Sequence, residues 1–182
     1  RAPFVMGKSD SPFSRNAEIF DTTIGWRFIN PLLSKMHHPY SMGETAENVA
    51  KKWNISREEQ DEFAYNSQLK YEQAHKNNRF AEELIPIEID LGKGKKMTFD
   101  KDEHPRLTPM NKLGELRPAF SKDGTVTAAN ASGVNDGAAA MLLASEAAVK
   151  KYDLQPIASI KSMAIAGVDP SIMGIGPVPA TQ

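Results

Sequence analysis

The sequence predicts a mixed α/β protein, and three parts of the chain carry this prediction. Residues 125–149 combine a short β-favouring run, a loop of small residues and a strong helix-forming run. Residues 42–53 and 57–77 have the apolar spacing of amphipathic helices. Residues 84–90 alternate apolar and polar side chains as a strand does, and a glycine- and lysine-rich turn leads to a partner strand at 96–99.

Composition excludes several classes of protein. The chain has 182 residues, which is enough to bury one sizeable core. Its net charge is -1 and charged residues make up 25%, so no global field favours nucleic acid or a membrane surface. No apolar run is long enough to span a bilayer and no signal-peptide pattern is present, so we expect a cytoplasmic protein. Cysteine is absent, which excludes disulfides, thiolate metal sites and a thiol nucleophile within these residues.

Residues 1–40 are rich in proline and have no sustained apolar period, so we expect mainly loops, with a strand-like or turn segment at 21–29. Two interpretations are open for the aromatic side chains of this region: a satellite core beneath a long loop, or partial exposure. These side chains are Phe4, Phe13, Phe20, Trp26 and Phe28. The adjacent His37 and His38 do not share a helix face and lack the spacing of a metal site, so we interpret them as surface residues.

The first predicted helix runs from Met42 to Trp53, with Ser41 or Gly43 at its start. Charged side chains occupy one side of this helix, so the other side is expected to face the core. The apolar stripe on that side consists of Met42, Ala46, Val49, Ala50 and Trp53.

The second predicted helix begins after a capping box formed by Ser56 and Glu59 and extends to about Asn77. Because the link between the two helices is short, the pair is expected to form an αα-hairpin. The rest of the second helix is heavily charged, which is typical of a solvated outer face. Its expected buried face consists of Phe63, Ala64, Ser67, Tyr71 and Ala74.

Pro86 marks the strand at 84–90 as an edge strand or a strand start, because proline cannot donate to a ladder. The following turn at 92–95 contains lysines that invite a phosphate-binding interpretation. Lysines on an exposed hairpin are usually solvated, and we favour that interpretation.

The stretch from 125 to 149 contains the most distinctive pattern in the chain. A strand is predicted at 125–127, and Asn135 or Asp136 is placed to cap a helix at 138–149 that is apolar nearly all round and therefore covered on both faces. The small residues between them either allow close packing of strand and helix, or present backbone N–H groups and the Ser132 hydroxyl to a ligand. A second β-like run follows at 157–165, and a glycine- and proline-rich loop is expected at 171–180.

The string TVTAANASGVNDGAAAMLLASE, residues 125–146, resembles the corresponding stretch of thiolases, which cleave or form 3-oxoacyl-CoA. The resemblance extends over essentially the whole chain and in thiolase order. It includes RAPFVMGK, MGETAENVAKKWNISREEQDEFAYNSQ, LRPAF and GVDPSIMGIGPVPA. The opening residues, RAPFVMGKSDSPFSRNAEIFDTTIGWRFINP, are most similar to the branch of the family that acts on 3-oxoadipyl-CoA.

This resemblance implies a fold of two similar, layered α/β halves with a loop subdomain inserted in the first half. Residues 1–124 would then form the loop subdomain, 125–153 the closing strand–loop–helix of the N-terminal half, and 154–182 the start of the C-terminal half. The nucleophilic cysteine of the family would precede this segment, and an acid/base cysteine and a histidine would follow it. We therefore expect an internal fragment of a thiolase, without catalytic residues of its own and inactive alone, from a protein of about twice this mass.

The resemblance also implies binding residues. Ser132 would hydrogen-bond a pantetheine amide, Arg106 would approach the adenine and phosphates of CoA, and Met42 would lie beside the acyl chain. Many thiolases have a histidine just before that methionine, whereas this chain has Ser41. Phe120 is a candidate wall of the pantetheine tunnel or a core residue. The complete set of expected CoA and substrate contacts is Ser132, Arg106, Met42, Phe120, Ala128, Asn130 and Met173.

No metal and no covalently bound cofactor are implied, since coenzyme A is a substrate of the family, and His104 is not expected to be the catalytic base. The expected reaction is cleavage of 3-oxoadipyl-CoA by CoA to succinyl-CoA and acetyl-CoA, in aromatic-compound catabolism. The distal carboxylate would need a cation, and the unranked candidates are Arg15, Arg27, Lys35 and His37. For Arg27, neutralisation in the full enzyme is expected to impair dicarboxylyl substrates selectively.

Two alternatives remain open from the sequence. One is a thiolase for acetoacetyl-CoA or for fatty-acid β-oxidation, and the other is a non-catalytic domain for CoA binding or assembly. The expected partners are acyl-CoA, CoA and further copies of the protein, as a dimer or tetramer, with no nucleic acid and no membrane.

Overall fold

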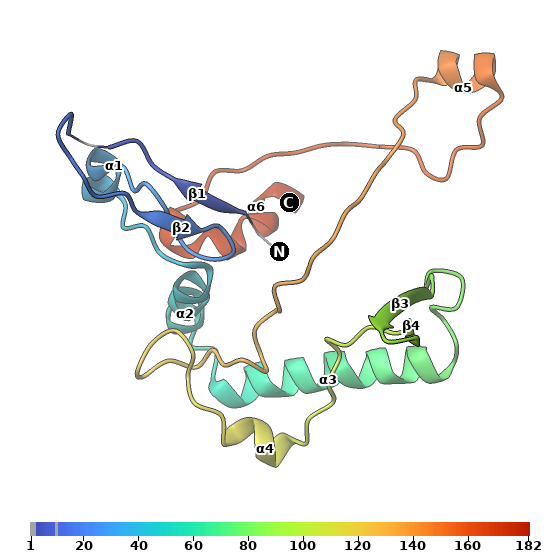
Figure 1. Cartoon of the computed structure of the whole chain (residues 1–182), viewed down its shortest axis with the longest axis horizontal. Coiled ribbons are helices and arrows are strands. Elements are labelled where there is room, and N and C mark those ends of the chain that lie inside the picture. The colour runs from blue at the N-terminus through green and yellow to red at the C-terminus, as the bar shows by residue number, and fades with distance from the viewer. Residues whose placement is uncertain (1–2, 10) are drawn as a thin grey trace. The chain divides into compact units, whose positions relative to one another are not determined.

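The computed structural model describes residues 3–9 and 11–182, and it contains helices and two separate two-stranded antiparallel sheets (Figure 1). The pattern of contacts between residues divides the chain into two compact units. One unit is Tyr40–Gly133, and the other combines the residues up to Pro39 with Val134–Gln182. Both helices and strands are present, as the sequence predicts. The boundaries proposed at 124/125 and 153/154 refer to a complete thiolase fold and stay a prediction.

Helix α2, Met42–Trp53, has the predicted bounds. Ser41 caps it through a reciprocal pair of hydrogen bonds: the Ser41 N–H donates to Glu44 Oε2 at 2.7 Å, and the Glu44 N–H donates to Ser41 Oγ at 3.3 Å. The helix ends at Asn54, whose φ of 51° lies in the left-handed region that asparagine tolerates. Ser41 is therefore the residue that starts the helix.

Helix α3, Arg57–Lys76, follows directly, and the predicted capping box is confirmed. The Ser56 N–H donates to Glu59 Oε2 at 2.7 Å, and the Glu59 N–H donates to Ser56 Oγ at 3.1 Å. The short helix α4, Met110–Gly114, packs against α3 within the same unit (Figure 1). Buried apolar side chains of this unit come from α2, α4 and the segment after Gly124, and they are Ala50, Leu113 and Val126.

The predicted buried faces of α2 and α3 are partly wrong. On α2, Ala50 is buried and Val49 half-buried, but Met42 is 70% exposed, and Ala46 and Trp53 are also exposed. On α3, Phe63 is 79% exposed and Ser67 is exposed, while Ala64, Tyr71 and Ala74 are half-buried. The physical reason is that polar side chains, Glu47 on α2 and Asp61 on α3, turn toward the rest of the unit and hydrogen-bond to it. Apolar periodicity does not detect such polar anchors.

The predicted hairpin is confirmed as β3, Ile87–Gly92, paired antiparallel with β4, Lys95–Phe99. Strand β3 starts just after Pro86, three residues later than the start of the alternating pattern, because proline has no N–H for the ladder. Lys93 and Gly94 form the turn with φ of 52° and 74°. The hairpin is exposed, and Lys96 Nζ lies 3.1 Å from Glu88 Oε2 at the surface, as expected for solvated lysines.

The other unit begins with β1, Phe4–Met6, which pairs antiparallel with β2, Ile19–Asp21. Helix α1, Pro31–Met36, follows and is capped by Asn30. The aromatic rings of Phe20 and Phe28 pack edge to face at 5.3 Å, whereas Phe4, Phe13 and Trp26 are exposed. A satellite cluster thus exists, but it contains few of the aromatic side chains of this region.

The chain after Gly124 departs most from the sequence-based expectations. No strand forms at 125–127 or 157–165, and the predicted helix at 138–149 is wrong: residues 134–145 have no regular structure (Figure 1). Helix α5 spans only Glu146–Tyr152, and the Ser145 hydroxyl accepts its capping hydrogen bond. The expected loop near 171–180 instead forms the 3-10 helix η1, Pro170–Ile175, and α6, Pro177–Thr181.

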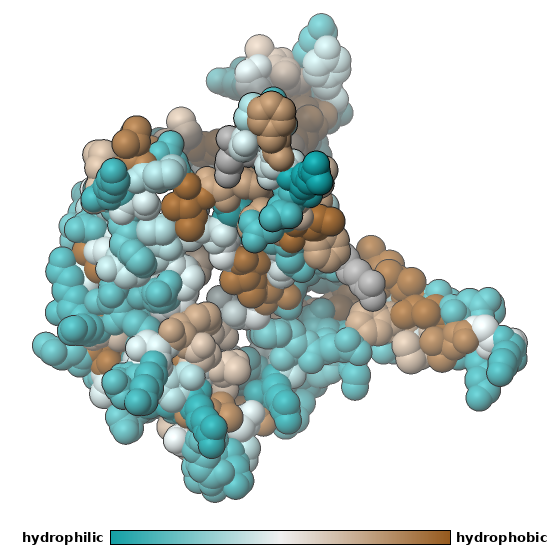
Figure 2. Space-filling model, turned by 60° about the vertical axis from the view of Figure 1, so that its left-hand side comes forward, coloured by the Kyte–Doolittle hydropathy of each residue, from teal (hydrophilic) through white to brown (hydrophobic). Residues whose placement is uncertain are grey.

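The departures at 138–149 and 157–165 share one physical cause. A segment that is apolar all round is stable as a helix only when both faces are covered, and a strand needs a neighbour for its ladder. Here Met141 is 85% exposed, and Leu142, Ile157 and Ile165 are exposed as well. Figure 2 shows brown, hydrophobic side chains at the surface, in keeping with this exposure. None of the helices in the described part of the chain combines the length and apolar character needed to cross a bilayer.

Candidate functional site

The small-residue segment 125–133, called the Ser132 loop below, is anchored by a carboxylate from α2. Both oxygens of Glu47 accept from the Thr125 N–H, at 2.9 and 3.0 Å. Glu47 also accepts from the Val126 N–H at 2.8 Å and from the Thr125 hydroxyl at 3.1 Å. A side chain at Gly124 would collide with this carboxylate, so the carboxylate approaches the backbone in space that glycine leaves open. Glu47 thereby fixes the start of the Ser132 loop to the middle of α2.

A second anchor comes from α3. Asn130 Oδ1 accepts from the Thr127 N–H at 2.7 Å, and Asn130 Nδ2 donates to Asp61 Oδ1 at 2.9 Å and to the Thr125 carbonyl at 3.0 Å. Asp61 is only 3% exposed, and its other oxygen lies 2.8 Å from Arg57 Nε. The carboxylate is thus paired on both sides, which is the usual condition for burying a charge.

The backbone of the Ser132 loop turns sharply around Thr127. This residue is fully buried, and its carbonyl accepts from the Ala131 N–H at 3.0 Å. Ala128 and Ser132 are exposed on either side of the turn. The loop therefore hides its anchoring groups and leaves a methyl group and a hydroxyl open to solvent.

Phe120 lies directly against the first turn of α2. A Cβ at Gly43 would overlap the Phe120 ring, so the ring occupies the space that a side chain would take. The neighbouring Ala119 N–H donates to the Val126 carbonyl at 2.9 Å, which holds this segment beside the Ser132 loop. Met42 precedes Gly43 at the start of the helix and is exposed. Apolar side chains of two elements are thus available near one another for a ligand.

His104 contacts the other end of the Ser132 loop. A Cβ at Gly133 would collide with the His104 imidazole, so the ring lies directly over the backbone next to Ser132. Two residues further on, the Arg106 N–H donates to Gln68 Oε1 on α3 at 2.9 Å, and the Arg106 side chain is exposed. Both basic side chains therefore come from a segment held to this unit.

All the predicted contact residues except Met173 lie within Tyr40–Gly133, and Met173 lies in η1 of the other unit. The binding role expected for the Ser132 loop stays a prediction, and the sequence analysis missed the residues that anchor the loop, Glu47, Asp61, Arg57 and Gln60. Gln60 Nε2 donates to Thr125 Oγ1 at 2.8 Å. The only signal for any of them was the spacing of Arg57 and Asp61, four residues apart on a helix.

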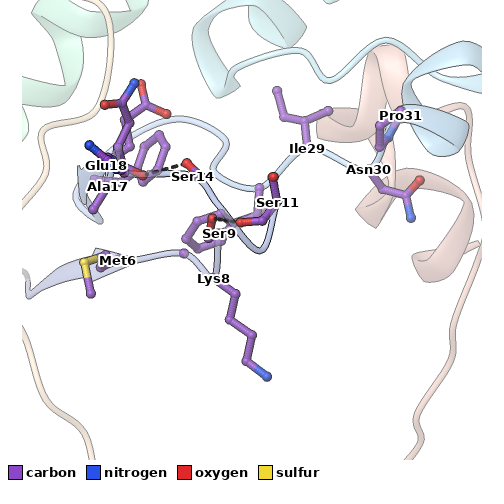
Figure 3. Close-up of a pocket in the computed structure, with 15 residues that line it drawn as sticks. Met6, Lys8, Ser9, Ser11, Ser14, Ala17, Glu18, Ile29, Asn30 and Pro31 are labelled. Atoms are coloured by element: carbon purple, nitrogen blue, oxygen red, sulfur yellow. Dashed lines mark hydrogen bonds between the residues drawn. The ribbon is translucent and has the colours of Figure 1, made fainter.

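A cavity of about 1080 Å³ lies within the N-terminal segment, between Met6 and Pro31 (Figure 3). Its lining includes Lys8 and Arg15 together with several serines, and the Lys8 side chain extends away from Ser9 and Ser11. Arg27 is engaged elsewhere, because its Nη1 donates to the carbonyls of Ile24 at 3.3 Å and Gly25 at 2.7 Å.

The last residue of β2 has a perturbed carboxyl group. Hydrogen bonds from the side chain and the backbone N–H of Thr23 lower the pKa of Asp21, and the charge of Arg27 adds to the effect. Among the described residues, no cluster of histidine and carboxylate side chains could hold a metal ion.

Comparison with known proteins identifies the class of protein. The family described as "Thiolase, N-terminal domain" matches residues 10–147, so the chain belongs to the thiolase family. It is 52% identical to "Beta-ketoadipyl-CoA thiolase" of Escherichia coli and 53% identical to the Pseudomonas putida protein of that name, over 183 aligned residues covering 100% of this chain. The chain spans only 46% of the length of these relatives.

Solved structures agree with this assignment. The Bacillus anthracis acetyl-CoA acetyltransferase matches with a TM-score of 0.76 at 42% identity, covering 98% of this chain and 44% of that chain. Human mitochondrial 3-ketoacyl-CoA thiolase matches with a TM-score of 0.74 at 42% identity, covering 99% and 44%. The predicted thiolase resemblance and the predicted α/β fold class are therefore confirmed.

Proposed function

We propose that the complete protein containing this chain is an acyltransferase that cleaves 3-oxoadipyl-CoA with CoA, giving succinyl-CoA and acetyl-CoA. The observation that carries this proposal is the 52–53% identity, over the whole chain, to relatives named for β-ketoadipyl-CoA. Family membership supports the class of reaction, and the names of these relatives support the substrate.

The reaction would proceed by covalent catalysis with groups that this cysteine-free chain does not supply. A cysteine thiolate attacks the 3-oxo carbon, the bond between C2 and C3 breaks, and the acyl group remains on sulfur. The departing carbanion takes a proton from an acid/base group and leaves as acetyl-CoA. The thiolate of a second CoA then displaces the acyl group and frees the cysteine.

The contribution proposed for these residues is to bind CoA and line the acyl pocket. The exposed Ser132 hydroxyl would hydrogen-bond a pantetheine amide, and exposed Ala128 would allow the narrow chain to pass close to the backbone. Arg106 would stack on adenine or pair with phosphate. Phe120, Met42 and Met173 would provide apolar walls, and Asn130 would contribute to the lining through its backbone. CoA is then the partner of this surface, and a dimer or tetramer is the proposed assembly.

The distal carboxylate of the substrate would need a cation. Of the candidates, Arg15 is the strongest because it lines the N-terminal cavity, whereas the Arg27 guanidinium donates to turn carbonyls. We expect Arg15→Gln to lower kcat/KM for 3-oxoadipyl-CoA by about tenfold or more while sparing acetoacetyl-CoA, which has no distal carboxylate. Arg27→Gln is the matched comparison. Equal losses on both substrates would contradict a carboxylate-binding role.

The substrate proposal is tested by measuring thiolysis of 3-oxoadipyl-CoA, acetoacetyl-CoA and a long-chain 3-oxoacyl-CoA with the complete protein. We expect the highest kcat/KM for 3-oxoadipyl-CoA. Similar or higher values for acetoacetyl-CoA would favour the second candidate, an acetoacetyl-CoA thiolase. That candidate is supported by 54% identity over 143 residues to an acetyl-CoA acetyltransferase of Allochromatium vinosum. Binding of CoA without turnover of any substrate would favour a non-catalytic domain.

A further inference from the structure

The polar anchors of the Ser132 loop lead to an inference about how the proposed CoA surface is built. We propose that Asn130 is a positioning residue: its side chain, held by Asp61, fixes the Ser132 loop for CoA and does not itself contact CoA. This inference rests on the proposed function and assigns the side chain a role other than lining the pantetheine channel.

The hydrogen bonds of the Asn130 amide support this role. A side-chain amide has two N–H donors and one carbonyl oxygen. Nδ2 already has two acceptors, Asp61 Oδ1 at 2.9 Å and the Thr125 carbonyl at 3.0 Å, and Oδ1 accepts from the Thr127 N–H at 2.7 Å. Contact with a ligand through Nδ2 would require one of these bonds to break. The side chain therefore links both arms of the turn, and neither of its N–H donors is left for a ligand.

Asp61 extends the same link to the segment that carries Phe120. Its second oxygen lies 2.8 Å from Arg57 Nε, and Arg57 Nη2 donates to the carbonyls of Leu113 at 2.6 Å and Leu116 at 3.1 Å. One buried ion pair on α3 thus holds the end of α4, the chain leading to Phe120, and the Ser132 loop. Both proposed pantetheine contacts, Ser132 and Phe120, depend on it for their relative placement.

A purely structural role predicts loss of stability alone, whereas a positioning role predicts a selective loss of CoA recognition in folded protein. Ser56→Ala is a matched control, because it removes the cap of α3, the helix that carries Asp61, without touching the Ser132 loop. Both variants weaken interactions of the same helix, and only Asn130→Ala alters the turn beside Ser132.

The test is steady-state kinetics of the complete protein, at a temperature where circular dichroism shows each variant to be folded. We expect Asn130→Ala to raise the KM for CoA by about tenfold relative to Ser56→Ala, which corresponds to about 1.4 kcal/mol of weaker CoA binding. The loss in kcat should be smaller than the change in KM. A KM for CoA equal to that of Ser56→Ala would overturn the proposal.

A gentler variant covers the case in which Asn130→Ala does not fold. Arg57→Lys keeps a cation beside Asp61 but loses the donor to the Leu113 and Leu116 carbonyls, so we expect the KM for CoA to rise by about threefold. An unchanged KM in that variant would count against the link to α4. Wild-type protein that neither binds CoA nor turns over any 3-oxoacyl-CoA would overturn the proposed function. An active wild type with an unaffected Asn130→Ala variant would overturn this inference alone.

Discussion

At the residue scale, the surface proposed to bind CoA depends on glycines that leave room for other side chains. Because Gly43 has no side chain, the Phe120 ring can pack against α2. In the same way, Gly133 allows the His104 imidazole to pack against the Ser132 loop. Neither glycine has a positive φ, so the requirement is one of space and not of backbone conformation. Gly43 and Gly133 therefore mark points where two segments meet.

The requirement at Gly43 predicts the effect of adding one methyl group. Gly43→Ala should displace Phe120, at a cost of about 1–3 kcal/mol. We expect this cost to exceed the gain of about 1 kcal/mol from better helix propensity, so the variant should be less stable than wild type. Gly114→Ala in α4 is the control, since nothing lies within 4 Å of its added Cβ. Urea denaturation of the two variants checks the difference. A Gly43→Ala variant as stable as wild type would show that the ring moves aside at no cost.

The anchor at Glu47 predicts a second residue-scale effect. Glu47→Gln retains one acceptor oxygen but places an NH₂ group opposite backbone donors, so a loss of about 1–3 kcal/mol is expected. Glu62→Gln, on the exposed side of α3, is the control and should change stability by less than about 0.5 kcal/mol. Thermal or urea unfolding compares them. Equal effects would mean that the carboxylate contributes no more than an ordinary surface charge.

At the element scale, α2 and α3 have the same reciprocal cap at their N-termini, built by Ser41 with Glu44 and by Ser56 with Glu59. Hydrogen bonds from the backbone N–H and the hydroxyl of Ser56 lower the pKa of Glu59 below its ordinary value of 4.5. Each cap stabilises the start of its own helix.

The lowered pKa of Glu59 predicts how stability responds to acid. Because the folded-state pKa lies below the unfolded value, the Glu59 carboxylate stabilises the fold above about pH 4.5 and loses this effect as pH falls through the folded pKa. The difference in melting temperature between wild type and Glu59→Gln should therefore be largest near neutral pH and shrink below about pH 4. A difference that stays constant between neutral and acidic pH would contradict this account of the capping box.

At the scale of the whole molecule, the two compact units differ in how well their residues are covered. The unit Tyr40–Gly133 has a network of partly and fully buried polar side chains, whereas residues 134–145 and 157–165 are irregular and expose large apolar side chains. The relatives are about twice as long as this chain, which covers 46% of their length. In such a protein these apolar segments would have further chain to pack against.

Amide hydrogen exchange can compare the 182-residue chain alone with the complete protein. In the 182-residue chain alone, amides of α2 and α3 should exchange slowly and those of 134–145 and 157–165 should exchange at nearly the rate of an unfolded chain. In the complete protein we expect the same two segments to be protected. Fast exchange of these segments in the complete protein would contradict the idea that they become buried helix and strand.

Local sequence was sufficient for elements whose signals lie within a few residues. The capping box at Ser56 and Glu59, the bounds of α2 and the turn at Lys93 and Gly94 are all as predicted. These features depend on backbone conformation and on hydrogen bonds between near neighbours, which the order of residues specifies directly. The thiolase resemblance likewise followed from strings of residues and is confirmed by the family match.

Tertiary contacts decided which faces are buried and which polar groups anchor the candidate site. Glu47 and Asp61 looked like ordinary charges on solvated helix faces, yet they bind a loop 78 and 69 residues further along the chain. Conversely, the apolar run at 138–149 has strong helix propensity but no covered faces here, and most of it is not helical. Hydrogen-bond partners and burial depend on what the fold brings close, and that proximity cannot be read from local periodicity.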